Sequence, residues 1–143
     1  MCLPITNSIL STNVTDPVHS SQAMVVGMLA DSKLEVREVA AVTLAGLLKG
    51  ASPTEAHQLR SSFQADVARF SSRHRNKRGA AAAGPALSLA EKHAAVLGLQ
   101  AFVQLAAYDV PPWLPAVLTS LATAASEPAP IRTTVRTVHW CSP

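Results

Sequence analysis

The sequence predicts an all-α fold built from stacked pairs of helices. Apolar residues recur at helical spacing in several segments, and no segment shows the long alternation of β-branched and polar residues that indicates a strand. Hydrophobic residues make up 48% of the chain but aromatic residues only 4%, so we expect an aliphatic, alanine-rich core with close helix–helix packing. A single helical pair cannot bury its own apolar faces, so the pairs are expected to stack.

The segment 29–49 has the pattern of a turn followed by the second helix of a HEAT-type repeat. Asp31 stands at the turn, where its carboxylate can accept hydrogen bonds from the free N–H groups of the next helix. Arg37 is expected to reach the capping aspartate of its own repeat or of a neighbouring one. The apolar residues that follow predict one buried stripe, formed by Val36, Ala40, Leu44 and Leu47. The chain therefore reads as a HEAT-like helical-repeat solenoid of about five to six helices.

The first helix is predicted over residues 20–30 and the second over residues 34–49, where Gly50 suits the stop of the second helix. The preceding residues 1–19 show no clean period and contain two prolines, so we expect an irregular segment there.

Two capping boxes mark the starts of the third and fourth helices. Ser52 is followed by Glu55 at three residues' spacing, with Pro53 at the first helical position, and Ser88 is followed by Glu91 in the same way. The third helix presents a narrow apolar stripe, formed by Leu59, Phe63, Val67 and Phe70. The fourth helix is apolar around much of its circumference, so we expect it to be central.

A fifth helix is predicted over residues 113–125, and a short last helix is expected to begin near Ile131. Leu118 and Leu121 are predicted to lie in the core. Trp113 follows two prolines, which fits packing at a helix start, and anchoring a partner protein is the alternative.

The apolar–arginine pair Ile131-Arg132 near the end of the chain repeats the pair Val36-Arg37 of the first repeat. Each pair follows an apolar helix and a short turn, which supports a repeat architecture over a four-helix bundle. We divide the chain into an irregular segment 1–19, a first repeat part 20–71, a basic and Ala/Gly-rich linker 72–87, a second repeat part 88–137 and an irregular tail 138–143.

The chain carries a formal net charge of +3, and its main charge cluster lies in the predicted linker. The cluster consists of Arg73, Arg75, Lys77 and Arg78. It is a candidate nuclear-import signal or phosphate contact, with a solvated, extended loop as the alternative. Nucleic-acid binding is not expected, because no aromatic residues interleave the cluster to stack on bases.

The sequence shows no constellation of residues typical of an enzyme or a metal site. Two cysteines stand at opposite ends of the chain and five histidines are scattered without metal-ligand spacing. His93, near the start of a predicted helix, fits a packing or surface residue better than a ligand. No signal peptide or apolar run long enough for a membrane span is recognisable. We expect no cofactor, no catalytic residue and no membrane partner.

Several segments, taken in order, resemble one family of large helical-repeat proteins. They are LEVREVAAVTLAGLL, then EKHAAVLGLQAFV followed by YDVPPWLPAVLTSLA, and finally EPAPIRTTV. The match covers most of the chain, and the second and third segments at this separation are the most specific. The chain thus resembles the C-terminal domain of the proteasome activator complex subunit 4 family, the HEAT-repeat cap of the 20S proteasome.

This resemblance implies a non-enzymatic protein that caps the α-ring of the 20S core particle and opens its gate. It implies stimulated, ubiquitin-independent degradation of peptides and acetylated histones, in DNA repair and spermatogenesis. The implied partners are the 20S α-ring and acetylated histones, and the implied location is the nucleus and cytoplasm.

Two departures from the family pattern limit what carries over. The family ends in a hydrophobic–Tyr–any tail whose carboxylate inserts between α-subunits, whereas this chain ends WCSP, so we expect a truncated or alternative end without gate opening. The family's acetyl-lysine pocket uses an Asn-Phe pair just after the LEVRE helix, where this chain has Ala51 and Ser52. Neither offers the amide or the aromatic wall that acetyl-lysine needs, so histone recognition through these positions is not expected.

Two other interpretations stay open from the sequence. The chain can be a generic nuclear HEAT module that contacts histones or nucleic acid through its basic loop, which a salt-dependent shift of DNA mobility would favour. It can also be a truncated, marginally folded product, because uncovered apolar faces at the end of a solenoid lead to association.

Overall fold

The computed structural model describes residues 17–75, 87–106 and 108–140, and these form six helices and no strand. In chain order the helices are α1 (Pro17–Met28), α2 (Leu34–Leu48), α3 (Pro53–Arg75), α4 (Leu89–Leu105), α5 (Leu114–Ala124) and α6 (Ile131–Trp140). The prediction of an all-α fold is therefore confirmed for the described part of the chain.

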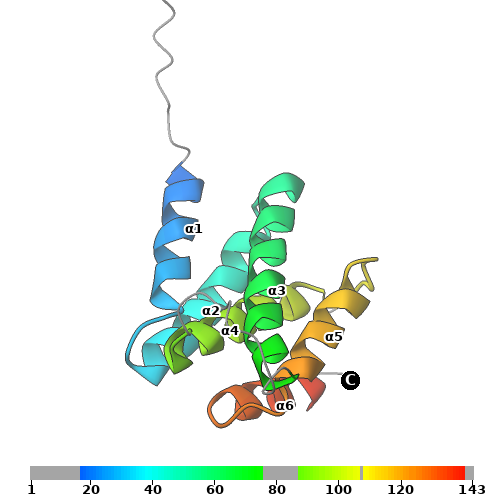
Figure 1. Cartoon of the computed structure of the whole chain (residues 1–143). Helices are drawn as coiled ribbons and strands as arrows, with labels where there is room; N and C mark the ends of the chain where they lie inside the picture. Colours follow the sequence, from blue (N-terminus) through cyan, green and yellow to red (C-terminus); the bar gives the residue numbers. More distant parts are fainter. Residues whose placement is uncertain (1–16, 76–86, 107, 141–143) are drawn as a thin grey trace, which may run out of the picture.

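The helices form three consecutive pairs whose members lie in two layers. Each pair packs together, α1 on α2, α3 on α4 and α5 on α6. One layer contains the even-numbered helices, with α4 between α2 and α6, and the other contains α1, α3 and α5, which follow one another from left to right in Figure 1. In the odd-numbered layer α3 packs on α5, but α1 is not packed closely against α3. This stacking of pairs is consistent with a helical-repeat fold.

The two predicted capping boxes are confirmed at the starts of α3 and α4. The backbone N–H of Ser52 donates to Glu55 Oε2 at 3.1 Å, and the Glu55 N–H donates back to Ser52 Oγ at 3.3 Å. At α4 the matching distances are 2.7 Å from the Ser88 N–H to Glu91 Oε2 and 3.2 Å from the Glu91 N–H to Ser88 Oγ. The hydrogen bonds from Ser88 hold the pKa of Glu91 below its usual value.

Three helix ends differ from the sequence-based boundaries by three or more residues. The first helix begins at Pro17 rather than residue 20, because proline at the first helical position lacks only an N–H that has no helical partner anyway. The third helix runs to Arg75, so residues 72–75 are helical rather than part of a linker. The last helix runs to Trp140, so residues 138–140 do not belong to an irregular tail. The predicted irregular residues 1–16 and the linker residues 76–86 lie outside the described residues.

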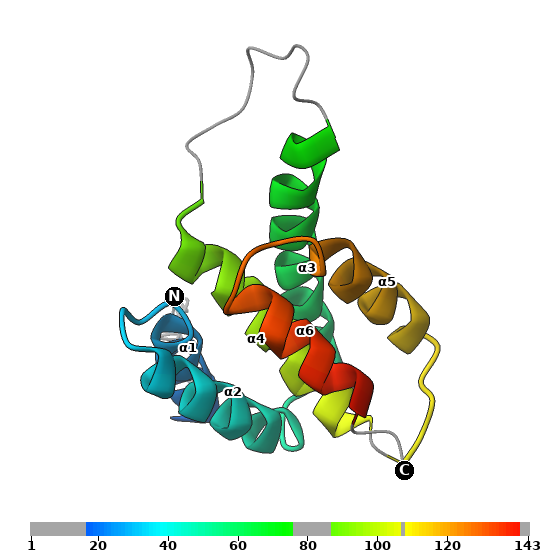
Figure 2. The same ribbon diagram turned by 90° about the horizontal axis from the view of Figure 1, so that it is seen from below.

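The fourth helix is central, as predicted, and packs on α2, α3, α5 and α6 (Figure 1 and Figure 2). Its side chains Val96, Leu99 and Phe102 are buried almost completely. The stripe predicted for the third helix is confirmed, because Phe63, Val67 and Phe70 are buried and Leu59 is partly buried against the core.

Two predictions about buried residues were wrong in detail. In α2 the buried stripe is turned by one position, so that Leu48 is buried while Val36 and Leu47 are half-buried. The helix α2 packs on both α1 and α4. The face that these two helices cover is shifted from the predicted stripe toward Arg37, Ala41 and Leu48. In α5, Leu121 is buried as expected, but Leu118 is 43% exposed because it points away from the neighbouring helices.

The helices α3 and α4 approach closely where Gly98 faces Phe63. A Cβ atom at position 98 would lie 2.5 and 2.6 Å from the Cζ and Cδ2 atoms of the Phe63 ring. That ring is buried in the core and has little room to move. We expect Gly98→Ala to lower the free energy of unfolding by about 1–3 kcal/mol, in spite of alanine's better helix propensity.

Urea unfolding followed by circular dichroism measures this loss. Gly46→Ala is the matched control, since a Cβ atom there meets nothing within 4 Å and the residue is exposed on α2. That substitution should be neutral or stabilising. Adding Phe63→Leu to Gly98→Ala should recover part of the loss by making room. An equal effect at positions 46 and 98 would contradict the close approach.

Candidate functional site

Asp31 closes the turn between α1 and α2 instead of capping α2. Its Oδ1 accepts a hydrogen bond from the Lys33 backbone N–H at 2.8 Å, and the N-cap position is Lys33, which makes no side-chain capping bond. Arg37 lies one turn into the helix with 7% exposure, and its Nε and Nη1 atoms have no hydrogen-bond partner among the described residues. The prediction that Arg37 contacts Asp31 is therefore wrong within the described residues, because the Asp31 carboxylate accepts hydrogen bonds from the turn residues Ser32 and Lys33 instead.

Arg37 belongs to a buried polar cluster in the layer of α2, α4 and α6. His93 of α4 is fully buried, and its Nε2 lies 2.8 Å from Oγ1 of Thr134 of α6. The Thr134 hydroxyl is also within 3.3 Å of the Pro130 carbonyl oxygen. Burial, and then the nearby Arg37 charge, lower the pKa of His93 to about 4. At neutral pH this histidine is an uncharged packing residue, as the sequence indicated.

An ion pair joins α4 to the turn between α5 and α6. Lys92 Nζ lies 3.2 Å from Glu127 Oε2, and Glu127 is 2% exposed. The same ammonium group lies 5.5 Å from the centre of the Phe70 ring of α3. Lys92 thus links α4 to α3 and to the turn between α5 and α6.

Trp113 packs at the start of α5. Its ring meets the Phe102 ring edge-on, with centroids 5.9 Å apart, and the Arg60 guanidinium of α3 lies 4.7 Å from its centroid. Partial burial lowers the pKa of Arg60. These contacts support the packing role of Trp113 over the alternative of a partner anchor.

The remaining residues singled out in the sequence are distributed over separate parts of the fold. In the two repeat signatures Ala40 and Ile131 are buried, Val36 is half-buried and Arg132 is exposed. Both signatures lie at or near helix starts in the even-numbered layer, but their arginines differ, since Arg37 is buried.

The positions Ala51 and Ser52 and the described part of the basic cluster lie at opposite ends of α3. Ala51 is half-buried and Ser52 is exposed at the turn before α3, where the Ser52 hydroxyl and N–H both contact Glu55. In the basic cluster, Arg73 and Arg75 lie in the last turn of α3, while Lys77 and Arg78 lie outside the described residues. The structure does not bring Ala51 and Ser52 together with Arg73 and Arg75.

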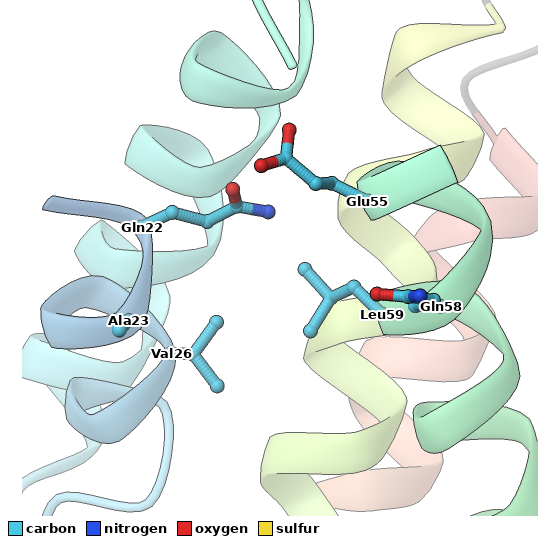
Figure 3. Close-up of a pocket in the computed structure, with 6 residues that line it drawn as sticks. All are labelled: Gln22, Ala23, Val26, Glu55, Gln58 and Leu59. Carbon is cyan, nitrogen blue, oxygen red and sulfur yellow. The ribbon is translucent and has the colours of Figure 1, made fainter. Parts of the chain in front are cut away.

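A groove separates α1 from α3, at the place where the odd-numbered layer is not closely packed. Its volume is about 410 Å³, and it is lined by Gln22, Ala23, Val26, Glu55, Gln58 and Leu59 (Figure 3). Sequence reasoning missed this groove, because its two walls are separated by about 30 residues and each looks like an ordinary amphipathic helix.

Among the described residues, no group of three or more histidine, cysteine, aspartate or glutamate side chains is arranged to hold a metal ion. None of the helices in this part of the chain combines the length and apolar character that crossing a membrane requires.

The fold defines a class of protein: an all-α stack of helical pairs that offers surfaces and a groove. Comparison with known proteins narrows the class further. Residues 89–139 match the family described as "Proteasome activator complex subunit 4-like, C-terminal". The chain is 35% identical over 133 residues to "Proteasome activator complex subunit 4" of Homo sapiens, an alignment that covers 91% of this chain and 7% of that protein.

A plant relative is similar to a shorter part of the chain. "Proteasome activator subunit 4" of Arabidopsis thaliana is 44% identical over 108 residues, covering 76% of this chain and 6% of that protein. The chain therefore belongs to the proteasome activator complex subunit 4 family and matches its C-terminal domain, which confirms the resemblance seen in the sequence. It spans 6–7% of the length of these relatives. No solved structure matches the chain significantly.

Proposed function

We propose that this chain is a non-enzymatic proteasome-activator module that associates with the 20S core particle. The observation that carries the proposal is the similarity to proteasome activator subunits over most of the helical part, from α1 to α6. The stack of helical pairs supports it, since such repeats typically present extended surfaces to other proteins. In this proposal the α-ring is the partner, and the helical surface holds the module against it.

Co-sedimentation with purified 20S core particles tests the proposal. Three forms are compared: the chain as it stands, the same chain ending in a hydrophobic–Tyr–any tripeptide, and that form with the tyrosine changed to alanine. A peptide carrying the tail alone controls for binding by the tail. We expect the tailed chain to sediment with the core particle more completely than the peptide, because the helical surface adds contacts.

Each outcome decides one part of the proposal. Binding of the tailed and untailed chains would assign the contact to the helical surface. If the tailed chain binds and its tyrosine-to-alanine form does not, the contact with the core particle is made by the tail, which the folded module presents. If the tailed chain binds no better than the tail peptide, the helical module contributes nothing and the proposal is wrong.

Recognition of acetylated histones through Ala51 and Ser52 is not part of this proposal. The Ser52 Oγ lies 2.7 Å from Glu55 Oε2 and its N–H donates to the same oxygen, so both polar groups serve the start of α3. Ala51 has only a methyl group to offer. These positions lack the amide donor and the aromatic surface that an acetyl-lysine site needs.

We also propose that the chain occurs in both nucleus and cytoplasm, and that the cluster Arg73, Arg75, Lys77 and Arg78 supports nuclear import. Fused to a reporter too large to diffuse through nuclear pores, the chain should accumulate in nuclei. Changing the four residues to alanine should abolish the accumulation. The exposed arginines Arg132 and Arg136 of α6 provide the control pair, and their change to alanine should leave accumulation intact. Equal nuclear levels of all three forms would refute the import role.

A further inference from the structure

The guanidinium group of Arg37 is enclosed in the helical stack without a counter-charge. Arg37 is 7% exposed, and its Nε and Nη1 atoms have no hydrogen-bond partner among the described residues. Taking a charged group out of water without a partner is strongly unfavourable. Buried polar groups without partners are also rare in folded proteins, so this one points to a group that binds here.

The acidic side chains near Arg37 in the described part of the chain are engaged elsewhere or exposed. The Asp31 carboxylate closes the turn before α2, and Glu91 completes the capping box of α4. Glu35 and Glu38 are exposed on α2 itself. Arg37 forms no ion pair with any described carboxylate. Its counter-charge is therefore not supplied by the helices that surround it.

The next junction of the stack shows which group belongs at this position. Figure 2 shows α4 between α2 and α6. Lys92 is the fourth residue of α4, just as Arg37 is the fourth residue of α2. Lys92 pairs with the buried Glu127, which lies four residues before the start of α6. The corresponding residues 76–88 before α4 include no aspartate or glutamate. The α2–α4 junction thus has the cation of the pair without the acid.

The nitrogen atoms of Arg37 favour a carboxylate as the missing group. Its Nη2 atom is not among the enclosed atoms, so a ligand can reach it from the surface. A carboxylate at Nη2 can also accept a hydrogen bond from one of the two enclosed nitrogens, in the planar bidentate geometry that guanidinium and carboxylate share. The small exposed area suits one carboxylate at the tip of a side chain better than a large polyanion.

We propose that the α2–α4 junction binds a carboxylate, which an aspartate or glutamate side chain of a partner polypeptide presents to Arg37. The acid of the partner takes the position that Glu127 has at the next junction. Because it supplies the counter-charge that Arg37 lacks, its binding also stabilises the folded chain. This site is separate from the proposed association with the proteasome and does not depend on it.

Fluorescence anisotropy with two labelled peptides tests the site. The glutamate peptide has the sequence of residues 123–131, TAASEPAPI, which forms the acidic turn at the next junction, and the glutamine peptide carries the change Glu127→Gln. We expect the glutamate peptide to bind at least about tenfold more tightly, as for one hydrogen bond between charged groups. Acetate represents a free carboxylate, and at the concentration of the peptide it should not compete.

One variant, one matched control and one spectrum locate the binding. Arg37→Met keeps an unbranched side chain but removes the charge, so the two peptides should bind it equally. Arg132→Met is the control, because Arg132 follows Ile131 as Arg37 follows Val36 but is exposed. This variant should keep the preference for the glutamate peptide. In the wild-type chain that peptide should shift the Nε–H resonance of Arg37 in nitrogen-15 NMR spectra. Unfolding temperatures verify that both variants fold.

The proposal fails if the glutamine peptide binds the wild-type chain as tightly as the glutamate peptide, or if neither binds. It also fails if Arg37→Met retains the preference. Equal effects of Arg37→Met and Arg132→Met would show a contact with the basic surface at large and would refute the site. Competition by acetate at the concentration of the peptide would assign the site to free carboxylates and overturn the role of a partner side chain.

Discussion

Replacing Phe102 by alanine is expected to lower the free energy of unfolding by about 3–5 kcal/mol. Phe102 is 1% exposed on the central helix, and its ring contacts the edge of Trp113 and lies under the guanidinium of Arg60. The substitution leaves a cavity and removes both ring contacts at once. Because domains of this size are typically stable by only about 5–15 kcal/mol, the variant should lose a large part of its total stability.

Urea unfolding monitored by circular dichroism and by tryptophan fluorescence measures the loss at Phe102. Tyr108→Ala is the control, because Tyr108 is an aromatic residue just beyond the same helix and is fully exposed. Its removal should change the stability by no more than about 0.5 kcal/mol. If Phe102→Ala lowers the free energy of unfolding by less than about 1 kcal/mol, the burial of Phe102 in the core is contradicted.

Acidification from pH 7 to pH 5 should remove about 2 kcal/mol of stability through His93 alone. Burial and the Arg37 charge hold the pKa of this histidine at about 4 in the folded chain, against 6.5 in the unfolded one. The unfolded state therefore binds a proton first as pH falls. The contribution is fully present above pH 6.5 and is lost progressively as the pH falls toward 4.

The variant His93→Gln isolates this effect. It cannot titrate, so the difference in unfolding free energy between pH 7 and pH 5 should shrink by about 2 kcal/mol, whatever its stability at pH 7. Arg37→Met removes the neighbouring charge and should weaken the dependence without abolishing it. Identical pH dependence in the wild type and His93→Gln would contradict the assignment.

The starts of the helices were the most predictable part of the fold, because their signals are local. The pairs Ser52–Glu55 and Ser88–Glu91 each satisfy their own hydrogen bonds within four residues, so the starts of α3 and α4 follow from the sequence. The start at Pro17 was missed because proline also marks irregular segments, and only the packing of α1 on α2 decides between the two.

The faces of the helices and the candidate site were less predictable, because they depend on neighbours distant in the sequence. Leu118 has the right spacing for a core residue, but none of the six described helices covers that side of α5. The burial of Arg37 follows from the packing of α2 on α4, and the sequence of α2 alone does not indicate this contact. The groove could be suspected only from Glu55 and Leu59 standing one turn apart on one side of α3, and its other wall is supplied by α1.

The incomplete packing of the odd-numbered layer has a mechanical consequence. The pair of α1 and α2 is fastened to the rest of the stack mainly along one edge, where α2 meets α4, while the middle pair is held in both layers. A helical pair held through one helix–helix contact can rotate about that contact more easily than a pair held through contacts in both layers. We expect the α2–α4 contact to act as a hinge, so that rotation about it would widen or narrow the space between α1 and α3. We expect the backbone amides of α1 to exchange with solvent faster than those of α4.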